Sequence, residues 1–385
     1  MKKLLLAVFS IATTFSLYAQ REVPQERMEQ IYEEVKTPYK YGLAVAPADN
    51  YHKIDCPTVF RQGDKWLMTY VVYNGKGGTD GRGYETWIAE SDNLLEWRTL
   101  GRVLSYRDGK WDCNQRGGFP ALPDMEWGGS YELQTYKGRH WMTYIGGEGT
   151  GYEAVKAPLY VGLAWTKGDI STAHEWESLD KPILSIHDKD AQWWEKLTQY
   201  KSTVYWDKDK TLGAPFVMYY NAGGRHPETD LKGERVGIAL SKDMKTWKRY
   251  SGNPVFAHEA DGTITGDAHI QKMGDVYVMF YFSAFEPSRK YKAFNTFAAS
   301  YDLVNWTDWK GADLIIPSKN YDELFAQYRL LNAEGKLLIA AVPTRRAGIT
   351  LFEDWDNMGQ RQTDSGSATF EKVAVAEREI LANPG

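Results

Sequence analysis

Cysteine, basic stripes and long apolar segments are all scarce in this sequence of 385 residues. The two cysteines, Cys56 and Cys113, permit either one disulfide bond or two buried thiols, and the sequence leaves both interpretations open. Charges of both signs are mixed to a net charge of -5, without the basic stripe that nucleic-acid binding needs. After the first twenty residues, no apolar run is long enough to cross a membrane. We therefore expect neither a nucleic-acid partner nor a membrane anchor.

The first nineteen residues have the pattern of a secretory signal peptide. Lys2 and Lys3 supply a charged start, the run "LLLAVFSIATTFS" is apolar, and Ala19 is a small residue suited to cleavage. No cysteine follows that point, as the anchor of a bacterial lipoprotein would require. We expect a mature chain that begins at Gln20 and is periplasmic or secreted.

Aromatic residues and glycine are abundant, with 15 Trp, 25 Tyr and 35 Gly. Aromatic strands joined by glycine turns are typical of all-β proteins. The exception is "PQERMEQIYEEVK", where Pro24 suits a first helical turn and apolar residues recur at helical spacing. We predict one amphipathic helix that packs against the β domain; the alternative is that it binds a second subunit, as in a homodimer. Its apolar face consists of Met28, Ile31, Tyr32 and Val35.

One short phrase, Ser-x-Asp/Asn-Leu/Met-x-x-Trp, occurs three times with constant spacing. The copies run from Ser91 to Trp97, from Ser241 to Trp247 and from Ser300 to Trp306. A spacing kept this strictly indicates a repeated structural unit. An Asp or Asn at the third position can bond to its own backbone and close a turn, while the Trp packs between units. We interpret the phrase as architectural and assign it no catalytic role.

Hairpin patterns precede these phrases. Each is an apolar strand, a turn and an aromatic strand, and the five copies span residues 57–73, 131–147, 202–224, 268–284 and 328–342. A third strand follows four of them, and a degenerate phrase runs from Thr166 to Trp176. The pattern predicts an all-β fold, a five-bladed β-propeller over residues 51–385, preceded by a signal peptide (1–19) and a helical lead-in (20–50).

An acidic strand start, a hairpin and the Ser-x-Asp-Leu-x-x-Trp phrase together resemble the five-bladed propeller glycoside hydrolases. These include arabinanases and xylosidases of family 43, invertases and levansucrases, neoagarobiose hydrolases of family 117 and mannoside phosphorylases of family 130. The resemblance covers nearly the whole mature chain and selects no single family. It implies a carbohydrate substrate, cleaved by carboxylates at the starts of the innermost strands around the propeller axis. It implies no cofactor, although some relatives hold an axial calcium ion.

Glycoside hydrolysis needs a group that protonates the leaving oxygen and a carboxylate that attacks or activates water. Asp55 in "DCPTVF" resembles the Asp-Pro start of the first blade in these families, where the aspartate is base or nucleophile, although Cys56 intervenes here. Glu132 in "SYELQTY" has the reach that suits an acid. Asp267 in "GDAHIQK" would donate the proton or tune another group. We predict Asp55, Glu132 and Asp267 as the catalytic set.

The third blade departs from the family pattern, because Lys201 stands where arabinanases and invertases carry a carboxylate. An axial lysine would lower the pKa of nearby carboxylates or bind an anionic group of the substrate, and neither follows if it points outward. His269 lies two residues after Asp267 and so on the same strand face. Family 117 enzymes use a histidine as acid, and the alternative for His269 is a structural role.

Further candidates could contact the sugar. Tryptophan rings stack on sugars but also fill propeller cores, and those in predicted interblade segments are Trp111, Trp127, Trp193 and Trp194. The candidate polar contacts are Arg116, Arg225 and His226. The segment "DKDK" from Asp207 resembles half a calcium loop, but it falls where a hairpin turn is due, so we expect a turn.

Three functions fit this sequence. The leading hypothesis is an exported glycoside hydrolase. The second is a phosphorylase of the mannoside type, although no segment shows an obvious Arg/Lys/His cluster for phosphate. The third is a carbohydrate-binding propeller without catalysis.

Overall fold

The computed structural model describes residues 22–37, 44–45, 52–75, 81–154, 158–289, 293–314, 325–331, 337–343, 346–351, 368–376 and 380–382. The predicted signal peptide, residues 1–19, lies outside them, as does much of the predicted lead-in. Within the described part of the chain, no helix combines the length and apolar character needed to span a bilayer.

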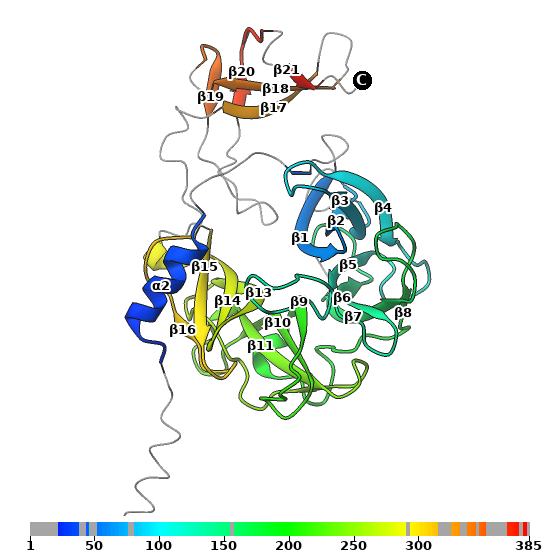
Figure 1. Ribbon diagram of the computed structural model, residues 1–385, viewed down its shortest axis with the longest axis vertical. Helices are drawn as coiled ribbons and strands as arrows, with labels where there is room; N and C mark the ends of the chain where they lie inside the picture. Colours follow the sequence, from blue (N-terminus) through cyan, green and yellow to red (C-terminus); the bar gives the residue numbers. More distant parts are fainter. Residues whose placement is uncertain are drawn as a thin grey trace, which may run out of the picture.

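Four antiparallel sheets of four strands each form the blades of a propeller, arranged side by side around a common centre (Figure 1). Blade 1 contains β1 (Lys53–Gln62), β2 (Lys65–Tyr73), β3 (Tyr84–Ser91) and β4 (Arg98–Leu104). Blade 2 contains β5 (Gln115–Pro120), β6 (His140–Gly147), β7 (Tyr160–Thr166) and β8 (Glu177–Ser178). Blade 3 contains β9 (Thr198–Trp206), β10 (Phe216–Arg225), β11 (Lys232–Ser241) and β12 (Trp247–Arg249). Blade 4 contains β13 (Ile264–Met273), β14 (Val276–Ala284), β15 (Phe294–Ser300) and β16 (Thr307–Asp308).

The predicted fifth blade does not form, so the propeller has four blades. The hairpin of β17 (Phe325–Leu331) and β18 (Leu337–Pro343) is present, but its third strand is the distant β21 (Ile380–Ala382). Between them, β19 (Ile349–Leu351) and β20 (Ala368–Phe370) pair only with each other. The sequence after β18 lacks the Ser-x-Asp-Leu-x-x-Trp phrase that leads the third strand into the fourth in blades 1, 3 and 4.

That repeated phrase is the turn between the third and fourth strands, as predicted. In blade 3 the Ser241 hydroxyl accepts the backbone N–H groups of Asp243 and Met244, and the Asp243 carboxylate accepts those of Lys245 and Thr246. Trp247 donates its indole N–H to the Met244 carbonyl at 2.7 Å. Blades 1 and 4 repeat the serine and Asx bonds. The turn at Asp207 is confirmed too, since its carboxylate accepts two backbone N–H groups.

The inner strand of blade 2 differs from the prediction. The hairpin pairs β5 with β6, whereas Glu132 and Leu133 take part only in isolated bridges within the connection. The β5 sequence "QRGGFP" is short and rich in glycine, which hides it from propensity arguments. The apolar alternation of residues 131–136 resembles a strand that the structure places elsewhere.

The predicted N-terminal helix is confirmed as α2 (Gln25–Val35). Its buried residues Met28, Ile31 and Val35 pack against blade 4, and Tyr32 stacks on Trp309 with ring centroids 5.0 Å apart. Figure 1 shows α2 beside β15 and β16. Blade 4 therefore occupies the apolar face that the sequence left open for a second subunit.

The inner strands β1, β9 and β13 all begin at one face of the propeller, which we call the entry face. The connections from second to third strands reach the same face, because Tyr73 pairs with Lys53 and Gly223 with Thr198. The first-to-second strand turns lie at the opposite face. Near the entry face, each of these inner strands carries a β-bulge in which two residues oppose one, a device that re-aims side chains at active sites.

Candidate active site

Titratable side chains from three inner strands converge at the entry face. The charges of Asp267 and Lys201 both act on Asp55, and Lys201 also acts on His269. We call the set of Asp55, Cys56, Lys201, Asp267 and His269 the axial cluster. The structure thus brings together four of the predicted site residues from blades 1, 3 and 4.

Asp55 accepts hydrogen bonds at both carboxylate oxygens. Its Oδ1 accepts the Cys56 backbone N–H at 2.7 Å, and its Oδ2 accepts the Tyr152 hydroxyl at 2.6 Å. Burial raises the pKa of Asp55 to about 6, although these two hydrogen bonds and the charge of Lys201 act in the opposite direction. A carboxyl group with such a pKa is suited to proton transfer near neutral pH.

Lys201 points into the cluster rather than outward. Burial by itself lowers the pKa of its ammonium group, but the charges of Asp267, Cys56 and Asp55 outweigh burial and raise it. Its Nζ lies 5.5 Å from the ring centroid of Phe119, which β5 contributes. Lys201 is therefore a permanent cation beside two aspartates, and this explains the departure of the third blade from the family pattern.

The bulges correct the alignment of Asp55 with Asp267. Cys56 and Pro57 form the extra pair in β1, whereas Asp267 and Ala268 form it in β13. Cys56 and Asp267 are accordingly equivalent positions, and both have left-handed backbone conformations, with φ of 50° and 61°. Such values are uncommon for residues other than glycine and cluster at functional sites.

His269 has a structural environment. It lies 3.5 Å from the Tyr205 hydroxyl and 3.1 Å from the Gln271 side-chain nitrogen. Burial, with the charge of Lys201, lowers the pKa of His269 to about 4. The imidazole is therefore neutral at physiological pH, which argues against the role of general acid.

Two further carboxylates at the entry face were missed by the sequence analysis. Glu153, in the connection between β6 and β7, has a left-handed φ of 53°, and its charge acts on Cys56 and Tyr152. Glu234 in β11 accepts the side-chain N–H of Asn221 at 3.2 Å, and the Asn221 oxygen lies 3.4 Å from the Asp267 backbone nitrogen. Neither is on an inner strand, where the repeat predicts acids. The available signals were the Tyr-Glu pair in a glycine-rich connection and an acid near the start of a third strand.

Glu132 and Trp127 lie at the opposite face, contrary to prediction. Glu132 is exposed, and its carboxylate lies 3.3 Å from the backbone nitrogen of Gly63 in the β1–β2 turn. Trp127 stacks on Phe280 and bonds through its backbone to Lys272, near the end of β13. A strand rise of about 3.3 Å per residue puts both roughly 20 Å from the axial aspartates. Glu132 is therefore not part of the axial carboxylate set.

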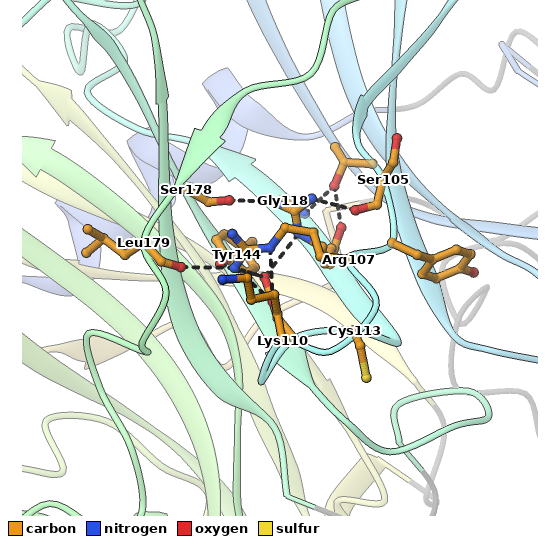
Figure 2. A network of polar contacts seen from close by, with 12 residues as sticks. Ser105, Arg107, Lys110, Cys113, Gly118, Tyr144, Ser178 and Leu179 are labelled. Atoms are coloured by element: carbon orange, nitrogen blue, oxygen red, sulfur yellow. Dashed lines mark hydrogen bonds and ion pairs between the residues drawn. The ribbon is translucent and has the colours of Figure 1, made fainter.

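Arg116 is also displaced from the predicted substrate contact, because its side chain is fully buried between blades 1 and 2. It lies 3.1 Å from Asp112, and it donates to Glu175 and to the Ser178 hydroxyl, each at 2.7 Å. Asp112 also accepts Arg107 and the Tyr144 hydroxyl. Figure 2 shows these side chains converging in one polar network. The network joins neighbouring blades rather than binding sugar.

We expect Arg116→Met to destabilise the fold by about 3 kcal/mol, since it removes one partner from a buried ion network. Chemical denaturation measures this loss. The turnover per folded molecule should stay unchanged, whereas a contact to substrate would raise KM. Arg98→Met is the matched control: the Arg98 side chain is 72% exposed in its pair with Glu90, so that loss should stay within about 0.5 kcal/mol.

The other aromatic and polar candidates divide into two groups. Trp194 is fully buried in the core, and Trp111 stacks on Tyr144, so both have packing roles. Trp193, Arg225 and His226 lie by contrast on the rim of the entry face, beside the β10–β11 connection. They remain candidates for contact with substrate.

The two thiols are not joined to each other. Cys56 and Cys113 are both free, so the disulfide alternative is wrong. Burial and nearby carboxylates raise the pKa of the Cys56 thiol well above its usual range, which makes it a poor nucleophile. Among the described residues, no group of three or more His, Cys, Asp or Glu side chains is placed to hold a metal ion.

Comparison with known proteins gives short and long matches. No family model matches the sequence. Over 53 residues the chain is 66% identical to the probable FMNH2-dependent monooxygenase SfnC of Pseudomonas putida, and over 75 residues it is 39% identical to dibenzothiophene monooxygenase of Mycolicibacterium goodii. These matches cover 14% and 20% of this chain. The chain spans only 13% and 17% of the length of these curated relatives, so the matches do not extend monooxygenase activity to it.

A solved structure named "Glycoside hydrolase" is 91% identical to the chain, with a TM-score of 0.77, and the match covers 83% of this chain and 92% of that one. The chain belongs to the glycoside hydrolases. A second solved structure, a complex of BT0996 with the carbohydrate RGII, matches this glycoside hydrolase with the same identity, coverage and TM-score.

A third solved structure supports the fold alone. The family 117 glycoside hydrolase Zg3597 of Zobellia galactanivorans is 13% identical, with a TM-score of 0.52, over 85% of this glycoside hydrolase and 87% of that protein. The predicted propeller relationship is therefore confirmed, with the corrected number of blades. The comparisons do not favour the phosphorylase or the non-catalytic binding module.

Proposed function

We propose that this protein hydrolyses a glycosidic bond of an RGII oligosaccharide at the axial cluster. The observation that carries the proposal is Asp55, whose pKa of about 6 allows it to hold a proton near neutral pH. The similar protein solved as an RGII complex supports the substrate class.

In this proposal Asp55 protonates the leaving glycosidic oxygen. Asp267, beside the Lys201 ammonium, supplies the carboxylate that attacks the anomeric carbon or activates water there. Tyr152 fixes Asp55 through its 2.6 Å hydrogen bond. Trp193 and His226, at the rim, contact the sugar beyond the cleaved bond.

The test is product analysis after incubation with RGII oligosaccharides, with and without inorganic phosphate. Hydrolysis releases a free sugar at the same rate in both conditions. A phosphate-dependent reaction that yields a sugar phosphate would identify a phosphorylase instead, and binding without product would identify a non-catalytic module. Four isosteric variants, D55N, D267N, E153Q and E234Q, rank the carboxylates. Larger losses in the two glutamine variants than in the two asparagine variants would move the reacting pair to Glu153 and Glu234.

The proposal includes export of the enzyme. The support is the charged, apolar and small-residue pattern of residues 1–19. Expression of the full chain in a bacterium with two membranes should give a periplasmic product whose mass corresponds to a start at Gln20. A cytoplasmic product of full length would contradict export.

A further inference from the structure

The left-handed backbone at Cys56 is unusual, because cysteine gains nothing sterically from a positive φ. It has a φ of 50° and follows Asp55 directly, in the β1 bulge where Cys56 and Pro57 together oppose Tyr70. The equivalent bulge positions in β13 and β9 are occupied by Asp267 and by the Tyr200–Lys201 pair. At each of these three positions, the extra residue contributes to the axial cluster or flanks a residue that does.

The consequence for Asp55 is a specific hydrogen bond. Because the chain turns at Cys56, its backbone N–H points back to the Oδ1 of the preceding carboxylate at 2.7 Å. The Tyr152 hydroxyl holds the other oxygen at 2.6 Å. An extended Cys56 would carry its N–H into the β1–β2 ladder and leave Asp55 held at one oxygen only.

We propose that Cys56 is a positioning residue, whose left-handed backbone conformation, rather than its sulfur atom, fixes the orientation of Asp55 for catalysis. The sulfur has no chemical role in this proposal, since a thiol that stays protonated neither attacks nor binds a metal. The proposal rests on the proposed function of Asp55.

Substitutions at Cys56 separate backbone from sulfur. Glycine adopts positive φ readily, whereas the β-branched valine, close to cysteine in size, does so rarely. We expect Cys56→Gly and Cys56→Ala to keep kcat within about 3-fold, and Cys56→Val to lower kcat by about 10²-fold, as a small misplacement of a reacting group does. KM should change by less than about 2-fold in all three variants, because substrate binding is not altered.

The pH profile provides a readout that a merely structural role would not move. The Cys56 N–H lowers the pKa of Asp55, so its loss in Cys56→Val should move the Asp55 limb of the kcat profile to higher pH. Cys56→Gly should leave that limb in place. If Cys56→Val fails to fold, Cys56→Thr, which is also β-branched, replaces it.

Two results would overturn the proposal. Wild-type kcat and pH limb in folded Cys56→Val or Cys56→Thr would show that the backbone conformation is not needed. Loss of activity in both Cys56→Gly and Cys56→Ala would show that the sulfur is needed. Failure of the proposed function is distinguishable, because D55N would then retain turnover whatever the variants at Cys56 do.

Discussion

Asp55→Asn is expected to lower kcat by about 10³-fold, the contribution of a positioned general acid. Asparagine keeps the size of the side chain and can still accept the bonds from Tyr152 and Cys56, but it has no proton to give to the leaving oxygen. KM should change little, because the loss falls on the transition state. Steady-state kinetics with an RGII oligosaccharide measures both constants.

The pH dependence sharpens this prediction. A general acid works in its protonated form, so kcat of the wild type should fall as the pH rises through about 6. The residual activity of Asp55→Asn should lack that limb. Asp243→Asn is the matched control: it makes the same chemical change in a surface turn where blade 1 naturally has Asn93. A folded Asp55→Asn protein with the turnover of Asp243→Asn would refute the assignment.

Lys201→Met is expected to destabilise the fold by about 3 to 5 kcal/mol, because it leaves Asp55 and Asp267 as uncompensated charges in a buried setting. The pKa of Lys201 is raised above 10.5, so its contribution is fully present below that pH and is lost only at more alkaline pH. The penalty should be larger at pH 8 than at pH 5, since Asp55 is mostly ionised at pH 8 and mostly protonated at pH 5.

Urea denaturation at the two pH values tests this second prediction. Loss of the cation also removes an influence that lowers the pKa of Asp55, so the kcat limb should move to higher pH. Lys208→Met is the control, because Lys208 is exposed in a hairpin turn and its loss should cost within about 0.5 kcal/mol. An equal penalty at Lys201 and Lys208 would mean that Lys201 does not neutralise the cluster.

Repetition made most of the fold predictable. The Ser-x-Asp-Leu-x-x-Trp turn records a local hydrogen-bond pattern, so three copies locate three blade edges without tertiary information. Where the repeat fails, prediction fails with it: β5 is short and rich in glycine, and the chain after β18 has no such turn. Propensity alone cannot distinguish Gln115–Pro120 from a loop.

The site was predictable only where it follows the repeat. Asp55, Lys201 and Asp267 lie at the starts of inner strands, and the structure brings them together. The bulges could not be seen, because one extra residue only displaces the alternation of a strand for two positions. Glu153 and Glu234 come from connections and outer strands, whose approach to the axis depends on how whole blades pack.

The packing of α2 has a consequence for handling the protein. Met28, Ile31 and Val35 cover apolar side chains of blade 4, and the backbone of Val23 is tied to Thr307 beside the outermost strand. A shortened chain starting at residue 37 would uncover this oily strip next to an unprotected sheet margin, the combination from which intermolecular strand pairing and clumping arise. Recombinant versions intended for kinetics should therefore keep the helix and carry any purification tag at the other terminus.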